Sequence, residues 1–466
     1  MTDTANRNLT RALTLTSAAA LILANVIGTG VFVKARVMTC NVGSPEMVLV
    51  VWLVAGFLSL AGALVYAELS SMMPRAGGEF HFIGAAFGPR WAFLYGWTKT
   101  ISLGASAAAV AILCVVFLND LVNGALSPLA LSLLPLLVIA IATFFNLATV
   151  RVNGHATTLL TCVKVGLVLM VGFGAFLFAD GTWDNYSLSG AGGSCEGVPE
   201  GARLGAGGFG AAMLGALWGY NGWAIISALG GEVHNPKRNI PLALIGGTGL
   251  IIILYLMVNA AYFYVLTPSE VASVGENSSV AFEVALRFTG PGVAAVISAC
   301  LMISAYGTLH TTLLSGPRLP FTMARANLLP ARFANLSDRS VPAVAVVVIG
   351  MWSLVLAASG TFDVLTDIYV FVLWIFFAMN GAAVIILRRR YPDFPRPYKV
   401  TGYPLVPVIF ILVAGYLLIN TLLVTPGRAL AGLALIVVGL PVYRYFERRM
   451  NHLGPKTWLG QEDSTN

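Results

Sequence analysis

The sequence predicts an all-α integral membrane protein, and three observations lead to this fold class. Of its 466 residues, 58% are hydrophobic, and the mean hydropathy is +0.83. Only 10% are charged, whereas soluble domains carry about 25% charged residues. The apolar residues gather in runs of roughly 20, the length that a helix needs to cross the hydrocarbon core of a bilayer. These observations exclude a soluble protein.

Twelve apolar segments meet this length criterion, so we expect 12 transmembrane helices. They begin near residues 14, 46, 90, 129, 155, 207, 241, 292, 342, 364, 404 and 427. The first follows Arg7 and Arg11, as the apolar part of a signal peptide would. It continues to Val33 without turning into a polar mature region, so we expect a retained span.

The distribution of positive charge predicts the orientation. With the N-terminus inside, 20 of the 27 Lys and Arg residues fall in inside loops and 5 fall outside. The outside set is Lys34, Arg36, Arg203, Arg287 and Arg428. By the positive-inside rule, both termini are therefore cytoplasmic in a multi-pass protein of the cell (inner or plasma) membrane. Because the basic residues are spread among short loops, nucleic acid is not an expected partner.

Two glycine-centred sequences interrupt apolar segments and predict broken helices. The first is Gly28-Thr29-Gly30 in the first span, and the second is Gly219-Tyr220-Asn221-Gly222 in the sixth. Freed backbone groups survive at membrane depth only beside a cavity or a bound solute. A pair of such breaks in corresponding halves indicates the substrate site of a transporter. The alternative is that these small residues only pack helices together.

The two breaks lie five helices apart, so the second lies in a helix that crosses the membrane in the opposite direction. This is the geometry of an inverted repeat of five plus five helices. We therefore expect a single transmembrane domain over residues 1–466. Its parts are a first repeat at 14–180, a second repeat at 207–390, and helices 11 and 12 at 404–449.

The predicted site follows from the backbone chemistry of the breaks. Free amides at a helix N-terminus bind anions, so the first break suits a carboxylate. Carbonyl groups that precede each break suit an ammonium group, and an amino acid carries both charges. The candidate substrate-binding residues are Asn25, Val26, Ile27, Gly28, Thr29, Gly30, Trp218, Gly219, Tyr220 and Asn221.

Two side chains near the breaks are candidates for gating or coupling. Trp218 directly precedes the second break, where an aromatic ring covers a bound solute; the alternative is ordinary packing. Lys164 lies in the middle of the fifth span, where a charge costs at least ~2.5–3.5 kcal/mol on insertion scales. Its ammonium either replaces a bridging sodium ion or carries a proton, and the alternative is a lysine that snorkels to the interface.

Other polar residues give weaker signals. Lys99 lies within the third span and has no assigned partner, and His310 in the eighth span is expected to be a packing residue. Cys40 and Cys195 fall in predicted outside loops and are able to pair, whereas Cys114, Cys162 and Cys300 are expected in the core. The cysteine and histidine spacings match no metal site, so we expect no metal and no cofactor.

Several motifs in order make the chain resemble the amino acid–polyamine–organocation (APC) superfamily, most closely its L-type amino acid transporter branch, which includes bacterial serine/threonine exchangers. The motifs are Ile27-Gly28-Thr29-Gly30-Val31-Phe32, Tyr66-Ala67-Glu68-Leu69, Pro74-Arg75-Ala76-Gly77-Gly78-Glu79, residues 230–241 (Gly-Gly-Glu-Val-His-Asn-Pro-Lys-Arg-Asn-Ile-Pro) and Arg396-Pro397-Tyr398-Lys399-Val400. The resemblance covers nearly all twelve spans.

The resemblance implies a LeuT-like fold with broken helices 1 and 6, and it implies that Lys164 occupies a vacant second sodium site with Ser304 as its partner. Asn25 and Asn221 depart from the usual residues of the branch. Arginine/agmatine antiporters tend to have a glutamate where this chain has Ala224, and they lack the lysine of helix five, so the comparison favours a neutral substrate.

We therefore expect a sodium-independent transporter of neutral L-amino acids, working as an exchanger by alternating access. The alternatives are a proton-coupled symporter that uses Lys164 and a cationic amino acid antiporter. An intramembrane enzyme and a channel lack the paired catalytic residues and the filter repeats that they need. Mammalian members pair with a heavy chain through a cysteine between helices three and four. Residues 119–128 contain none, so we expect no heavy-chain subunit.

Overall fold

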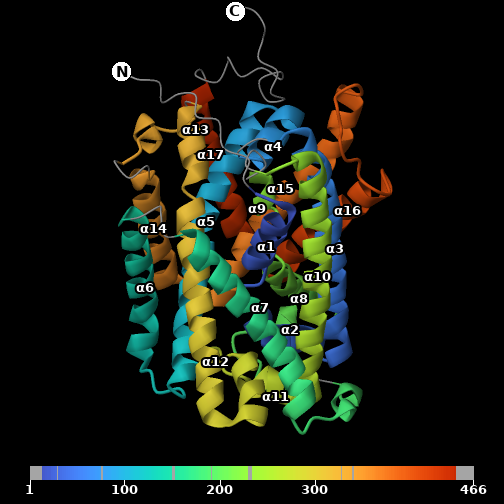
Figure 1. Cartoon of the computed structure of the whole chain (residues 1–466), viewed down its shortest axis with the longest axis vertical. Helices are drawn as coiled ribbons and strands as arrows, with labels where there is room; N and C mark the ends of the chain where they lie inside the picture. Colours follow the sequence, from blue (N-terminus) through green and yellow to red (C-terminus); the bar gives the residue numbers. More distant parts are fainter. Residues whose placement is uncertain are drawn as a thin grey trace, which may run out of the picture.

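The structure is a computed structural model, shown in Figure 1. It describes residues 13–28, 30–74, 77–148, 153–189, 192–228, 233–326, 328–337 and 341–447, and for residues 148, 153–161 and 228 it describes the backbone alone. Several predictions fall on other residues. Thr29 of the first break, residues 75–76 and 230–232 of the family motifs, and both chain termini lie outside the described residues.

Throughout the described ranges the regular secondary structure is helical, apart from an isolated bridge between Leu13 and Val233. The long helices are α3 (Pro45–Met72), α5 (Pro89–Leu121), α6 (Pro128–Ala148), α7 (Asn153–Phe178), α10 (Pro236–Val265), α12 (Val280–Ser315), α14 (Ala343–Ser359), α15 (Phe362–Arg390), α16 (Leu405–Val424) and α17 (Pro426–Glu447). The interrupted segments are α1 (Leu15–Val26) with α2 (Gly30–Val42) and α8 (Gly205–Gly219) with α9 (Ile225–Ala228). The short helices are α4 (Glu79–Phe87), α11 (Pro268–Ser273), α13 (Arg318–Arg325), η1 (Trp183–Ser187), η2 (Glu200–Ala202) and η4 (Ala331–Ala334).

Every predicted span coincides with a helix or a broken pair of helices. Eight helices of the described chain are long and apolar enough to cross a membrane, and the α1–α2 pair, bent by 45°, makes a ninth span if counted as one. The apolar parts of α7 (Cys162–Phe178) and α14 are shorter. The eighth predicted start, near residue 292, is wrong: α12 begins at Val280 and bends at Gly290, whose φ is 76°. Gly290 and Pro291 mark a bend within the helix and not its beginning.

Prolines and capping residues explain why these helices begin where they do. Pro45, Pro89 and Pro236 open α3, α5 and α10, at a position where the missing amide proton has no helical partner. Ser44 also caps α3, because its hydroxyl accepts a hydrogen bond from the backbone N–H of Met47. Local sequence signals therefore mark where these mainly apolar helices begin.

Burial separates central from peripheral helices. In α5, 78% of the apolar window is buried against other helices, whereas in α6 the share is 17%. Figure 1 accordingly places α6 at the margin of the bundle, beside α14. Large apolar side chains such as Leu133 and Phe144 point outward from α6, as expected of a helix that faces lipid. Cys162 is likewise exposed, so the expectation of a core position is wrong for this cysteine, while Cys114 is buried.

The two interrupted segments lie in the middle of the bundle and run in opposite directions. In Figure 1, α1 lies above α2, whereas the chain enters α8 below α9. α2 packs against α8, and α1 packs against α10 and α9. This arrangement brings the two breaks to the same depth.

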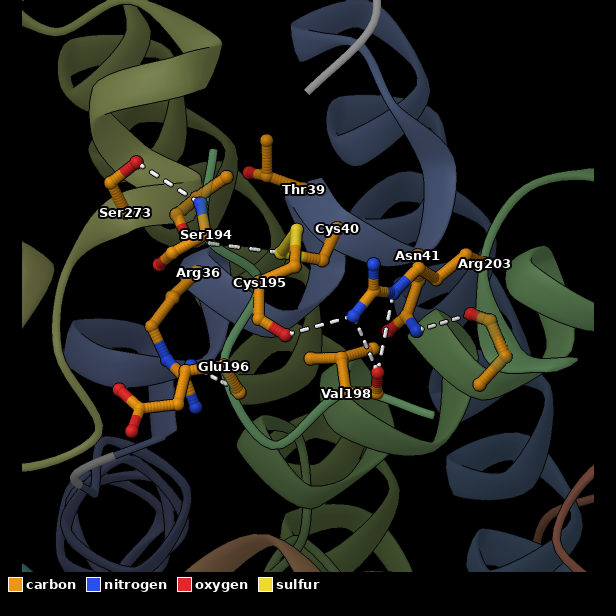
Figure 2. Close-up of a disulfide and its surroundings, with 12 residues drawn as sticks. Arg36, Thr39, Cys40, Asn41, Ser194, Cys195, Glu196, Val198, Arg203 and Ser273 are labelled. Atoms are coloured by element: carbon orange, nitrogen blue, oxygen red, sulfur yellow. Dashed lines mark hydrogen bonds between the residues drawn. A yellow bond between two sulfur atoms is a disulfide. The ribbon is translucent and has the colours of Figure 1, made fainter. Parts of the chain in front are cut away.

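A disulfide bond joins Cys40, in the last turn of α2, to Cys195, in the loop between α7 and α8 (Figure 2). Two hydrogen bonds from α2 to this loop strengthen the connection, and a third lies within the loop itself. Arg36 of α2 donates to the carbonyl group of Glu196 at 2.8 Å, and Asn41 of α2 donates to that of Ala202. Arg203 donates to the Cys195 carbonyl group at 3.1 Å. The loop is thus fixed to the lower half-helix of the first interrupted segment.

Candidate functional site

The two breaks are in direct contact at two places. A β-carbon on Gly30 would lie 2.9 Å from the α-carbon of Gly219 and 3.0 Å from the ring of Trp218. A β-carbon on Gly222 would lie 2.8 Å from the carbonyl oxygen of Asn25. Gly222 also has a φ of 125°, a conformation that L side chains rarely adopt. Glycine is therefore required at both contacts for close approach of the two backbones.

Some of the backbone hydrogen-bonding groups of the first break are paired with each other. α1 ends at Val26, and the N–H of Gly28 donates to the Val26 carbonyl group at 2.6 Å. The prediction of a free amide is therefore wrong for Gly28. Gly30 is the first residue of α2, so its N–H stands at the positive end of that helix. The carbonyl groups of Asn25 and Ile27 lie on the opposite side of the break, at the C-terminal end of α1.

Tyr255 of α10 connects the two breaks, and the sequence analysis did not identify it. Its hydroxyl group lies 2.6 Å from the carbonyl oxygen of Val26 and 3.0 Å from that of Gly219, and both oxygens are placed to accept its proton. The ring is fully buried and packs edge-on against Trp52. A sequence signal was available, because Tyr255, Asn259 and Tyr262 recur at helical spacing and form a polar stripe along an apolar helix.

Lys164 reaches from α7 to the first break and to α12. Its ammonium donates to the carbonyl group of Ala24 at 3.0 Å and to the hydroxyl group of Thr308 at 2.8 Å. The side chain is buried, which is not the position of a lysine that snorkels to an interface. The expected partner Ser304 is one turn away, and its buried hydroxyl has no hydrogen-bond partner among the described residues. The predicted partner Ser304 is therefore wrong, and Thr308 is the residue of α12 that binds Lys164.

Aromatic side chains close the second break toward α15. Trp218 is 8% exposed and packs edge-on against Phe362 and Tyr369, with ring centroids 6.0 and 5.5 Å apart. The amide group of Asn221 donates to the hydroxyl group of Tyr369 at 3.2 Å. Lys99 of α5 also contacts this tyrosine, with its ammonium 5.6 Å from the centroid of the Tyr369 ring. Tyr369 is thus a contact shared by Trp218, Asn221 and Lys99, and it connects Lys99, which had no assigned partner, to the second break.

Two of the candidate side chains point away from the breaks. The hydroxyl group of Tyr220 donates to the carbonyl group of Trp52 in α3, and its ring is buried there. The side chain of Asn25 donates back to the Leu21 carbonyl group of its own helix at 3.1 Å.

His310, expected to be a packing residue, lies 3.1 Å from the amide nitrogen of Asn146.

A buried charge cluster closes the side of the site opposite to α1. Lys34 of α2 forms an ion pair with Asp363, at the start of α15, and also donates to Thr366 at 2.8 Å. Arg36 lies 3.4 Å from the same carboxylate. Both cations are almost fully buried, so their assignment to an outside loop is wrong. A small cavity beside the cluster is lined by Lys34, Asp363, Asp367 and Arg428.

Comparison with known proteins identifies the family to which this chain belongs. The family model described as amino acid permease matches residues 13–441, which is most of the sequence. The chain belongs to the amino acid permease family. This family lies within the APC superfamily, so the resemblance inferred from the sequence motifs is confirmed.

The relatives of this permease are amino acid transporters and exchangers. It is 29% identical over 455 residues to the serine/threonine exchanger SteT of Bacillus subtilis (strain 168), covering 96% of this chain and 99% of SteT. It is 28% identical over 453 residues to the b(0,+)-type amino acid transporter 1 of Mus musculus, covering 96% and 90%. It is 28% identical over 440 residues to the large neutral amino acids transporter small subunit 2 of Homo sapiens, covering 92% and 79%.

At the level of the family, this permease is a multi-pass membrane transporter of amino acids of the antiporter type. The family is one of transporters, which is the class expected from the sequence. A small-molecule amino acid is the substrate that these relatives support.

Proposed function

We propose that this permease is a sodium-independent exchanger of neutral L-amino acids that works by alternating access. The observation that carries the proposal is the direct contact between the two breaks, next to the Ala24 carbonyl group that Lys164 binds. One end of the shared site offers the N-terminus of α2, which suits a carboxylate, and the other offers carbonyl groups at the end of α1. This pairing of charges fits a zwitterion.

Independence from sodium rests on the position of Lys164. Its ammonium joins the Ala24 carbonyl group to the Thr308 hydroxyl group, and so links α1 with α12 through α7. Oxygen atoms placed in this way on two helices would also suit a small cation, and a lysine already supplies that charge. The proposed role of Lys164 is to hold the first break in a binding geometry and to release it during transport.

Alternating access is proposed from the positions of the half-helices. The ion pair of Lys34 with Asp363 and the rings of Trp218 and Phe362 hold α2 and α8 against α15. Movement of α2 away from α15 would separate these contacts and open the site on that side. We assign this side to the exterior because the charge distribution places the N-terminal end of α1 at the cytoplasm.

The proposed architecture is a LeuT-like fold of 12 helices, with repeats at residues 14–180 and 207–390 and two further helices at 404–449. Both termini are proposed to be cytoplasmic, in the cell membrane. No disulfide-linked heavy chain is expected through residues 119–128, which contain no cysteine. Serine and threonine are the first substrates to test, because the Bacillus relative is named an exchanger of these amino acids.

The experiment is exchange by the purified full-length chain in proteoliposomes. Uptake of labelled serine should depend on unlabelled serine, threonine or another neutral amino acid inside the vesicle. It should be equal in sodium and in choline buffers, and unlabelled neutral amino acids should compete. Uptake driven by a pH gradient into empty vesicles would indicate the proton-coupled alternative. Preferred exchange of arginine or lysine would indicate the cationic antiporter.

A further inference from the structure

Lys99 is a partly buried cation within the helix bundle, and the proposed transport mechanism does not use it. It belongs to α5, the most enclosed helix, and its ammonium lies 5.6 Å from the centroid of the Tyr369 ring. None of the ion pairs among the described residues includes Lys99. A charge at this depth is costly, and a side chain retained there is a candidate for function.

The surroundings of Lys99 connect it to the second break. The Tyr369 ring packs against Trp218, and its hydroxyl group accepts from Asn221, which lies in the break itself. Tyr369 is therefore a neighbour that Lys99 shares with two residues of the proposed substrate site. In a medium with an effective dielectric constant of ~20, two unit charges ~10 Å apart interact strongly enough to change an equilibrium roughly tenfold.

An acidic group, Glu79 of α4, lies beside the same part of α5 as Lys99. Tyr95 precedes Lys99 by one helical turn and donates to Glu79, and Tyr66 donates to the other oxygen of this carboxylate. Lys99 interacts electrostatically with both Glu79 and Tyr369. Loss of Lys99 would therefore remove a repulsive cation and also leave the partly buried Glu79 carboxylate without this nearby positive charge.

We propose that Lys99 is a specificity-determining residue that excludes amino acids with cationic side chains from the substrate site. The proposal rests on the proposed function, since it concerns the same site and narrows its substrates. With the substrate's two backbone charges held at the breaks, its side chain lies among Trp218, Asn221 and Tyr369. A second positive charge placed there meets the field of Lys99, whereas an uncharged side chain of equal length does not.

The test uses L-arginine and L-citrulline, which have nearly the same shape and differ in side-chain charge. Both are added as competitors of labelled serine exchange in proteoliposomes, and the ratio of their inhibition constants is measured. In the wild type, arginine should bind at least tenfold more weakly than citrulline. Lys99→Gln should reduce the ratio about tenfold, Lys99→Arg should preserve it, and Glu79→Gln should increase it.

A control variant and a second measurement keep the test decisive. Arg287→Gln removes an exposed cation whose partner is Glu270, and it should leave the ratio unchanged. If Lys99→Gln exchanges too slowly, the same competition is measured by binding of labelled serine to the detergent-solubilised protein. A ratio within twofold of the wild type in Lys99→Gln would overturn this inference and leave neutral exchange intact. Absence of neutral exchange in the wild type would instead refute the proposed function.

Discussion

Gly30 and Gly219 face each other across the two breaks, and a β-carbon on Gly30 would lie 2.9 Å from the α-carbon of Gly219. Real β-carbons essentially never approach another backbone atom this closely. The two residues come from helices that run in opposite directions, so their contact fixes the distance between the two halves of the proposed site. A side chain at either position would force the half-helices apart.

We therefore expect Gly30→Ala to reduce amino acid exchange more than tenfold. Inserting a methyl group into a closely packed contact costs ~1–3 kcal/mol, and here the displaced atoms belong to the binding backbone. Exchange flux and serine binding are measured on the same preparation. Gly246→Ala in α10 is the control, because no atom lies within 4 Å of a β-carbon there. Normal affinity in Gly30→Ala would contradict the assigned contact.

Tyr255→Phe should weaken substrate binding about tenfold without unfolding the protein. The change removes the hydroxyl group that joins the carbonyl groups of Val26 and Gly219, and it keeps the ring that packs against Trp52. Loss of one partner of a buried hydrogen bond costs ~1–3 kcal/mol.

Tyr220→Phe is the matched control for Tyr255→Phe. Its hydroxyl group donates to Trp52 and does not touch the first break. This variant should lower the melting temperature while the affinity for serine stays within about twofold. Equal losses of affinity in the two variants would show that Tyr255 acts through general packing and not through the breaks.

The sequence predicted the helices well because local signals mark them. Pro45, Pro89 and Pro128 open helices within one residue of the predicted starts, and long apolar runs define the interiors. The predicted start of α12 was wrong because it relied on the same kind of signal. Gly290-Pro291 has the composition of a helix boundary, but here the pair lies at a bend within a continuing helix. Glycine and proline mark where the backbone departs from helical geometry, but they do not say whether the helix ends there or continues after a bend.

The site was only partly predictable, because pairing between helices depends on their rotation. The break sequences located Gly30 and Gly219. The polar stripe of Tyr255, Asn259 and Tyr262 marks one face of α10 but does not say which helices that face contacts, so Tyr255 was missed. Lys164 was located by its charge, yet its long side chain reaches two positions one turn apart on α12, and Ser304 was chosen in place of Thr308. Lys34 was assigned to a loop because charge was counted without its partner Asp363.

Lys164→Ala should impair exchange far more than it weakens substrate binding. The ammonium links α7 to the Ala24 carbonyl group and to Thr308, and these links must change when the half-helices move. Initial exchange rates and equilibrium binding of labelled serine are compared. Exchange should fall by more than tenfold, with affinity changed by only a fewfold, and full exchange in this variant would refute the role.

Two further variants separate the hydroxyl groups of α12. Thr308→Val removes the hydrogen-bond partner of Lys164 with little change in shape and should slow exchange severalfold. Ser304→Ala removes a hydroxyl group that makes no hydrogen bond within the part of the chain that the structure describes, and it should leave exchange close to the wild type. A larger loss in Ser304→Ala than in Thr308→Val would restore the partner expected from the sequence.

The disulfide of Cys40 with Cys195 provides a test of the proposed orientation. Disulfides persist in oxidising compartments, so this end of the bundle should face the exterior. Intact cells are treated with a membrane-impermeant phosphine reductant and then with a polyethylene glycol maleimide. The wild type should gain two labels on a gel relative to the Cys40→Ser/Cys195→Ser double variant. Labelling that requires permeabilised cells would mean that this end faces the cytoplasm, and the assignment of the sides would then be reversed.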